Sequence, residues 1–245
     1  VPLTGRKQVL LVSDQEVLSS SLTQYSDYMK SAKKSSSKDG AAMVTRVGKK
    51  IAAATEQYLR NNGLESEIKN FAWEFNLVND PQVNAFCMPG GKIVVYEGLM
   101  QLVSSDDELA VVVGHEVAHA VAKHSNERMS QQLMAQYGAQ ILGQALSNKS
   151  AAVQKIGASV YGLGAQYGVM LPFSRKHESE ADYMGLVFMA MAGYNPAVAV
   201  NFWQKMSAGK SGSTPEFMST HPSDATRINE IKQHLPEIEK YRVKK

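Results

Sequence analysis

Residues 115–119 read His115-Glu116-Val117-Ala118-His119, and this stretch decides how the chain around it is expected to fold. An α-helix turns by about 100° per residue, so two histidines four positions apart lie on one face, one turn above the other. Glu116 is rotated off that axis, toward the place where a water on a shared metal ion would lie. Two imidazoles, an open position for water and a carboxylate that takes its proton are what a zinc hydrolase needs. The stretch therefore predicts a zinc site on a helix, with Glu116 as general base.

The sequence before the motif predicts that this helix is buried. Ser104-Ser105-Asp106-Asp107-Glu108 supplies N-cap hydroxyls and first-turn acids, and an apolar run from Leu109 to Val113 leads into the motif. The alternative is a core helix that happens to carry two hydrogen-bonded histidines. Burying two imidazoles and a carboxylate side by side without a metal is costly, which favours the metal site.

The length and composition of the chain limit the number of domains that it can form. The chain has 245 residues, 44% of them hydrophobic, and a net charge of +3. These values predict a single domain over residues 1–245, with a lead-in helix and loop over 1–40, a catalytic core over 41–235 and a tail over 236–245. Basic residues are scattered, which gives no indication of nucleic-acid binding.

The cysteine content and the first residues of the chain are the features that relate to the cellular compartment of the protein. Cys87 is the only cysteine, so an intramolecular disulfide and a cysteine-rich zinc site are both excluded, and we expect Cys87 to be a small apolar filler. The chain begins at Val1 without a methionine or an apolar signal segment. We interpret it as a processed form whose targeting sequence is missing.

The region before the motif predicts two helices and a small antiparallel sheet. Ser13-Asp14-Gln15-Glu16 is a capping box that starts a helix to about Met29, and apolar residues recur at helical spacing from Ala41 to the stop signal at residues 61–63. Alternation over residues 71–78 predicts a strand, and a turn over 89–92 predicts a hairpin. An edge strand there can hold an extended peptide. The candidate substrate-binding residues are Asn84, Ala85, Phe86, Ile93 and Val94; the alternative is an ordinary structural hairpin.

Two further segments follow the motif. Residues 126–147 are predicted to be helical. Residues 156–174 carry no charge over 19 positions, close to the length of a membrane span, but they contain four glycines and a proline. We predict a pliable segment packed against or over the active site, with a membrane helix or transient membrane contact as alternatives.

The third zinc ligand is predicted in the helix that starts near Arg175. Glu178 and Asp182 are four apart and share a face, whereas Glu180 is turned away by about 200°. Glu178 is therefore the predicted ligand, and Asp182 the carboxylate that accepts a proton from a ligand imidazole. His124, about 140° round from His119 on a helix, is expected to be a capping or surface residue. His177 and His234 are expected at the surface.

His221-Pro222 precedes another predicted helix that carries Arg227. A histidine that is held by the following proline before a capped helix can stabilise the tetrahedral oxyanion opposite a zinc ion, with Arg227 nearby. The alternative is a structural loop histidine.

Four blocks in order resemble one known family. They are Asn84-Ala85-Phe86 with Pro89-Gly90-Gly91, the motif at 115–119, Ser174-Arg175 with Glu178, Ala181 and Asp182, and His221-Pro222 with Arg227. The sequence over about 77–235 is similar to the gluzincin zinc metallopeptidases that include the CAAX prenyl protease, HtpX and BepA. The resemblance implies His115, His119 and Glu178 as zinc ligands, Glu116 as general base, and His221 and Arg227 near the reacting carbonyl.

Together these patterns predict a mainly helical α+β zincin-type domain with a small antiparallel sheet beside the motif helix. The predicted activity is zinc-dependent endopeptidase cleavage of unfolded or envelope proteins, with one Zn²⁺ per chain and zinc-bound water activated by Glu116. The chain is similar to the soluble periplasmic, lipoprotein-like branch of this family, or to the catalytic core of its mitochondrial inner-membrane members. The first similarity implies a periplasmic location, with a lipid anchor ahead of Val1 as a hypothesis. The rival hypothesis is a zinc-containing, chaperone-like module that binds peptides without cleaving them.

Overall fold

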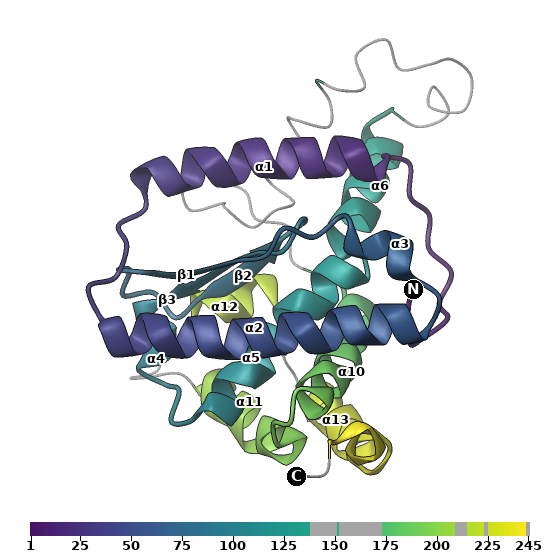
Figure 1. The fold of residues 1–245 in the computed structure, drawn as a ribbon. Helices are drawn as coiled ribbons and strands as arrows, with labels where there is room; N and C mark the ends of the chain where they lie inside the picture. Colours follow the sequence, from purple (N-terminus) through teal and green to yellow (C-terminus); the bar gives the residue numbers. More distant parts are fainter. Residues whose placement is uncertain (138–150, 152–172, 209–214, 223–224, 244–245) are drawn as a thin grey trace.

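The computed structural model describes residues 1–137, 151, 173–208, 215–222 and 225–243, and shows helices packed around a small sheet (Figure 1). The N-terminal half contains α1 Asp14–Ser31, α2 Lys38–Asn61, α3 Glu65–Ile68, β1 Glu74–Val78, β2 Ala85–Met88, β3 Lys92–Tyr96, α4 Glu97–Met100, α5 Asp106–Val121 and α6 His124–Tyr137. The C-terminal half contains α10 Arg175–Met191, the 3-10 helix η1 Pro196–Val198, α11 Ala199–Ala208, α12 Glu216–Thr220, α13 Ala225–Ile238 and the 3-10 helix η2 Glu239–Tyr241. The mainly helical α+β class is confirmed.

The helix starts follow from their caps. Ser13 and Glu16 form the predicted capping box of α1, and the Ser105 hydroxyl accepts a hydrogen bond from the Glu108 N–H at the start of α5. In return, the Glu108 carboxylate accepts from the Ser104 N–H at 2.7 Å. These reciprocal bonds satisfy amide groups that have no partner inside the helix, so the boundary of the motif helix is fixed locally.

The sheet differs from the predicted antiparallel sheet in the direction of one strand pair. β3 lies in the middle: β2 pairs with it antiparallel through the hairpin, but β1 pairs with it parallel. The predicted antiparallel sheet was therefore wrong in part. After β1 the chain leaves room for one strand and runs back as β2, and β3 then occupies the position between them, parallel to β1. Gly90 and Gly91 have φ of +95° and +82°, which glycine adopts without steric cost in the predicted turn.

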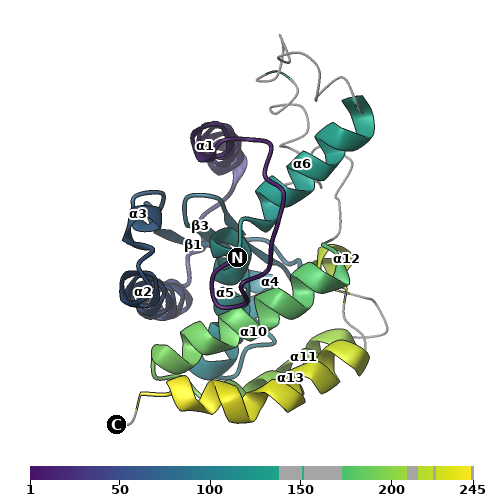
Figure 2. The ribbon, with the colours of Figure 1, turned by 90° about the vertical axis from the view of Figure 1, so that its right-hand side faces the viewer.

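Helices cover both faces of the sheet. Residues such as Leu77, Cys87 and Val95 point toward the cluster formed with α2 and α5, while Phe86 and Val94 point toward α1 and α6. Figure 1 shows α1 and α2 on opposite sides of the sheet, and Figure 2 shows α10, α11 and α13 gathered at the end away from α1. Cys87 is buried, as expected of an apolar filler.

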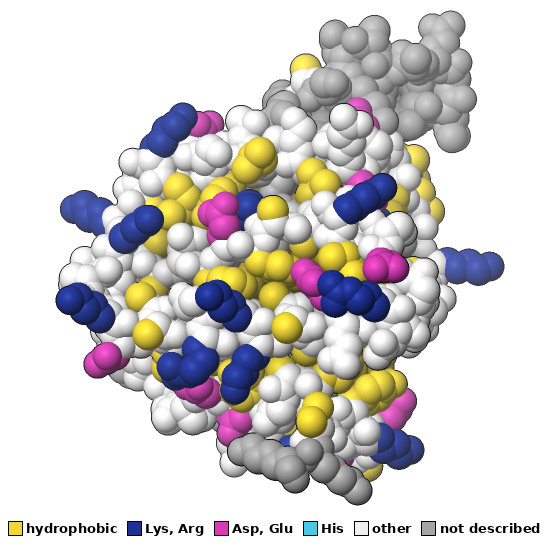
Figure 3. Space-filling model, viewed as in Figure 1, with side chains coloured by type: hydrophobic (Ala, Val, Ile, Leu, Met, Phe, Trp, Pro, Cys, Tyr) yellow, Lys and Arg dark blue, Asp and Glu magenta, His cyan; other side chains and the backbone are white. Residues whose placement is uncertain are grey.

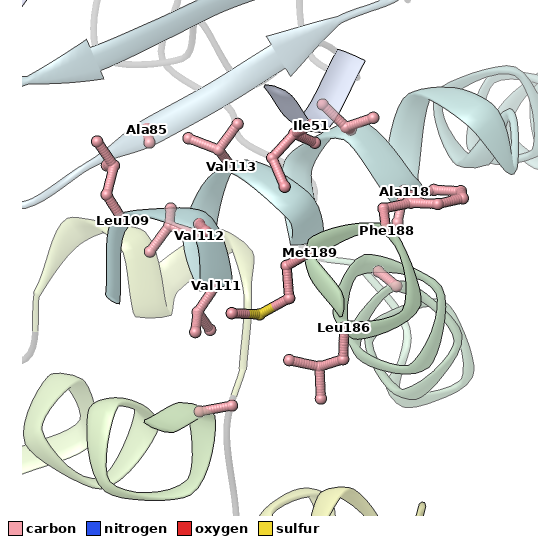
Figure 4. Close-up of a cluster of buried hydrophobic side chains, with 14 of the residues drawn as sticks. Ile51, Ala85, Leu109, Val111, Val112, Val113, Ala118, Leu186, Phe188 and Met189 are labelled. Atoms are coloured by element: carbon pink, nitrogen blue, oxygen red, sulfur yellow. The ribbon is translucent and has the colours of Figure 1, made fainter. Parts of the chain in front are cut away.

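The motif helix α5 is the centre of the larger core. Figure 4 shows Val111, Val112 and Val113 pointing to different sides of α5, with Ile51 from α2 and Met189 from α10 beside it. All five side chains are at most 2% exposed. Burial of each such side chain is worth roughly 1.5–3 kcal/mol, so packing holds α5 in place on every side.

Within the described residues, no helix combines the length and apolar character needed to cross a membrane. The predicted helix over 126–147 is observed as α6, which begins at His124, and its part beyond residue 137 lies outside the described residues. Most of the uncharged segment 156–174 lies outside them as well. The proposed division into lead-in, core and tail stays a prediction.

Candidate active site

Four side chains that could hold a metal ion converge where α5, α10 and the C-terminal end of α12 meet. The Nε2 atoms of His115 and His119 lie 3.0 Å apart, and each lies 3.3 Å from an oxygen of Glu178. His221 Nδ1 lies 3.0 Å from Glu178 Oε1 and 3.3 Å from His115 Nε2. Tetrahedral zinc with ligands at 2.0–2.2 Å separates its ligand atoms by about 3.3 Å. The spacing and the donor set therefore fit zinc, with His115, His119, Glu178 and His221 able to hold it.

A close crossing of α5 and α10 brings these ligands together. A Cβ atom on Gly114 would lie 2.7 Å from the Gly185 carbonyl oxygen, and one on Gly185 would lie 2.6 Å from the His115 nitrogen. Only glycine at both positions lets the two backbones touch. Since His115 follows Gly114 directly, this contact sets the distance from the two histidines to Glu178.

Glu116 lies beside the cluster of possible metal ligands, and its role as general base stays a prediction. It is buried, and its Oε1 atom, 3.4 Å from His221 Nε2, has no hydrogen-bond partner among the described residues. Burial raises the pKa of Glu116, although positive charge on His221 and His115 acts to lower it. A buried carboxylate oxygen without a donor, beside a cluster of metal ligands, has a free lone pair for a proton.

Asp182 lies directly behind His115, and its role as the carboxylate that accepts the imidazole proton stays a prediction. Its Oδ1 lies 2.9 Å from His115 Nδ1, a contact that would keep the proton on Nδ1 when His115 Nε2 binds a metal ion. Burial acts to raise the pKa of Asp182, but the charge and hydrogen bonds of Arg227 lower it below its usual value. Burial likewise acts to lower the pKa of His115, but the carboxylates of Glu178 and Asp182 raise it to about 9.

Arg227 lies behind the metal ligands. Its guanidinium donates to both oxygens of Asp182, lies 2.9 Å from Glu178 Oε2 and packs over the ring of Trp203 at 4.7 Å. It was expected near the reacting carbonyl, and the geometry instead favours a role in holding two carboxylates. His221 was expected at the oxyanion; its Nδ1 lies among the ligand atoms, and its ring stacks on Phe217. The catalytic roles of both residues stay predictions.

The edge of the sheet next to Glu116 is β2. A cleft of about 30 Å³ is lined by Asn84 to Pro89 together with Glu116, His119, Ser125, Arg128, Phe173, Thr220 and His221. Asn84, Ala85 and Phe86 thus lie at the cleft, although the Phe86 ring points into the core under α1. Ile93 and Val94 lie in the central strand, which is paired on both sides, so their prediction as edge residues was wrong. Alternation alone does not tell a central strand from an edge.

Two histidines that were not expected in the interior are buried: His124, predicted to be a capping or surface residue, and His177, predicted to lie at the surface. His124 is 0% and His177 2% exposed, and their rings stack at 4.4 Å between centroids. Lys123 adopts a left-handed φ of +57°, which turns the chain back after α5 and brings His124 Nδ1 to 2.8 Å from His119 Nδ1. The prediction for His124 assumed a continuous helix, and this turn breaks it. His234 is exposed, as predicted.

Sequence reasoning also missed Arg128 and Phe173. The guanidinium of Arg128 lies 3.6 Å from the Phe173 ring centroid, and that ring stacks on His119 at 3.9 Å. Both line the cleft. No pattern in the sequence distinguishes them from other residues of their kind.

A family model described as Peptidase family M48 matches residues 45–235, which include the whole ligand cluster. The chain belongs to this family. It is 36% identical to the mitochondrial metalloendopeptidase OMA1 of Schizosaccharomyces pombe over 205 residues, which is 80% of this chain and 53% of that protein. It is 40% identical to OMA1 of Arabidopsis thaliana over 168 residues, 69% of this chain and 33% of that protein.

A bacterial relative extends the comparison. The beta-barrel assembly-enhancing protease of Yersinia pestis is 33% identical over 174 residues, 66% of this chain and 36% of that protein. The M48 chain described here spans about half or less of each of these relatives. The family resemblance seen in the four sequence blocks is confirmed.

Proposed function

We propose that this M48 domain is a zinc-dependent endopeptidase. The observation that carries the proposal is a Glu116 oxygen that meets no donor within the part of the chain that the structure describes and lies beside the ligand atoms of His115, His119 and Glu178. Zinc held by His115, His119 and Glu178, with His221 clear of the fourth position, would supply a Lewis acid that makes water nucleophilic at neutral pH and polarises the scissile carbonyl. Glu116 accepts the proton of the attacking water and passes it to the leaving amine.

The substrate class that fits the cleft is an extended peptide. The Asn84 carbonyl accepts from the Tyr96 N–H on β3, so the next residue, Ala85, points its backbone groups away from β3. The Asn84 side chain meanwhile accepts a hydrogen bond from the Ala85 N–H at 2.9 Å. A peptide added along β2 would be held by backbone groups, largely independent of its sequence. Unfolded proteins offer such segments.

An adjoining apolar cavity supports a protein substrate. It has a volume of about 370 Å³ and lies between the N-terminal segment, α1, α3 and the hairpin. Pro89, His119 and Ser125 line both this cavity and the cleft. Figure 3 shows hydrophobic side chains in the band between α1 and α2, among interspersed Lys, Arg, Asp and Glu. A bulky apolar side chain of a bound peptide has room there.

The proposal also includes gating, because a cleft of about 30 Å³ holds only about two water molecules. Substrate entry requires that some wall of the cleft move. Cleavage of unfolded envelope proteins, a periplasmic location and a lipid anchor remain predictions, since the relatives named above come from mitochondria as well as from bacteria.

Replacement of Glu116 by Gln tests the mechanism. We expect Glu116→Gln to retain one zinc per chain and to lose cleavage of an unfolded substrate such as denatured casein by at least a hundredfold. Glu108→Gln, the same change in the first turn of α5, is the matched control and should keep its activity. Undiminished cleavage by Glu116→Gln would refute the mechanism. Zinc and peptide binding without cleavage by the wild type would favour the chaperone-like module.

A further inference from the structure

The two zinc-ligand histidines are supported differently on the side away from the metal position. His115 Nδ1 meets the carboxylate of Asp182 directly. His119 Nδ1 meets a second imidazole, since the Nδ1 atoms of His119 and His124 lie 2.8 Å apart. The Nε2 atom of His124 in turn lies 2.9 Å from Glu180 Oε2. A ligand histidine is usually held by a carboxylate or a carbonyl, so an imidazole in that place requires a reason.

Metal binding by His119 determines where the protons lie in the series of hydrogen bonds from His119 through His124 to Glu180. With Nε2 of His119 directed at the metal, its proton is on Nδ1, which must donate. The Nδ1 atom of His124 must then accept, so the His124 proton is on Nε2 and is donated to Glu180. Each step has a donor and an acceptor, and His124 is fully buried. Among the three residues, one arrangement of hydrogens satisfies every bond while leaving the His119 lone pair free for the metal.

The far end of this chain of bonds is held by the N-terminal segment. Arg6 Nε donates to Glu180 Oε2 at 2.8 Å, and Thr4 Oγ1 donates to the other oxygen of Glu180. The two remaining nitrogens of the Arg6 guanidinium donate to the carboxylate of Glu127. Arg6 therefore joins Glu127 and Glu180, two acids that lie 53 positions apart in the sequence, in a nearly buried site.

The segment that carries Arg6 is itself fastened to α6. The Leu11 N–H donates to Ser130 Oγ at 2.8 Å, and the Asn126 side chain donates to the Val12 carbonyl at 2.8 Å. These bonds place the segment along the start of α6, where His124 and Glu127 lie. Docking of the first twelve residues and the position of His124 thus depend on the same helix.

We propose that His124 and Glu180 are positioning residues for the zinc ligand His119, and that Arg6 couples zinc affinity to docking of the N-terminal segment. The coupling acts through orientation: without Glu180 held in place, the His124 ring loses its anchor, and the His119 ring then loses the acceptor that fixes it. This inference rests on zinc binding, which is one part of the proposed function, and not on proteolysis.

The direct test is the zinc dissociation constant, measured by competition with a chromophoric chelator. His124→Phe keeps a ring of similar size but removes the acceptor for His119, and we expect zinc binding to weaken 10–100-fold. His177→Phe is the matched control. His177 is also buried and its ring stacks on the His124 ring, but it makes no bond to His119. We expect its zinc affinity to stay within about threefold of the wild type, with comparable urea unfolding of the two zinc-free variants.

Two further variants keep the test valid if His124→Phe does not fold. Arg6→Met is expected to weaken zinc binding about tenfold. Arg46→Met, which removes a similar two-bond contact to Asp106 on the surface, is its control and should leave zinc affinity unchanged. Unchanged zinc affinity in both His124→Phe and Arg6→Met would overturn the inference, whatever their activity. Absence of proteolysis by the wild type, together with the expected changes in zinc affinity, would contradict only the proposed function.

Discussion

Replacement of Gly185 by Ala probes how the two ligand helices set the metal site. A Cβ atom at this position lies 2.6 Å from the His115 nitrogen and 2.7 Å from the Gly114 carbonyl carbon, against an ordinary contact of at least 3.4 Å. Both neighbours are backbone atoms of α5, so no side chain can rotate away. The helices must separate by about 0.8 Å, whereas zinc–ligand distances tolerate only about 0.2 Å.

The effect on stability is expected to be small beside the effect on zinc. Overpacking costs typically 1–3 kcal/mol, but alanine gains about 1 kcal/mol over glycine in a helix interior, so the net loss is at most about 2 kcal/mol. Zinc affinity, by contrast, should fall at least tenfold, because Glu178 moves away from His115 and His119 together. The Gly185→Ala variant should therefore fold and yet bind zinc weakly.

The assay combines urea unfolding of the zinc-free protein with chelator competition for zinc. Ala190→Gly on the same helix is the control: it loses about 1 kcal/mol of helix propensity without widening the crossing, and its zinc affinity should match the wild type. A zinc dissociation constant of Gly185→Ala within twofold of the wild type would refute the idea that the glycine contact sets the ligand spacing.

Three other predictions follow from the buried charges. When free zinc is at a hundredfold excess over its dissociation constant, its removal should lower the free energy of unfolding by about 2.7 kcal/mol and Tm by about 5–10 °C in calorimetry. An unchanged Tm would contradict a zinc site in the folded protein. Arg227→Met should destabilise the zinc-free protein by about 3–5 kcal/mol in urea, since it strips the buried Asp182 of its cation, and a loss under 1 kcal/mol would count against this pairing. Burial acts to raise the pKa of Glu127, but Arg6 lowers it below the unfolded value of about 4.3, so its contribution is present above that pH and is lost as the pH falls through the folded pKa. Glu127→Gln should therefore be less stable than the wild type at pH 7, with the difference shrinking toward pH 3 in urea titrations.

Local features of this domain could be predicted from the sequence. The cap at Ser105, the shared face of Glu178 and Asp182 and the small residue Gly185 all depend on helix geometry over a few positions. Such geometry is the same in every helix, so spacing alone places these side chains. Helix spacing alone thus predicts His115, His119 and Glu178 as ligands, but it does not predict that His221 lies among the same atoms.

Features that depend on distant contacts could not be predicted. The central place of β3 results from how the chain returns after β1, and alternation reports only that each strand has two faces. The burial of His124 depends on a left-handed residue, Lys123, which carries no glycine signal. The position of Arg227 behind Asp182 depends on where α13 packs, which periodicity in α13 does not specify.

Charge balance links the ends of the chain to the metal site. Buried charges are stable only when they are paired, and α10 alone brings three carboxylates inside. With Glu116 from α5 these carboxylates make four negative charges. Two guanidiniums pair with them, one from α13 and one from the N-terminal segment. The residues are Glu116, Glu178, Glu180, Asp182, Arg227 and Arg6. Glu127 and Arg128 add one charge of each sign. Among these charged groups two negative charges are left over, which is the charge that a single divalent cation would neutralise. Without a metal, protonation of His115, whose pKa is raised to about 9, offsets part of this excess, so the charge around the ligand cluster favours zinc there.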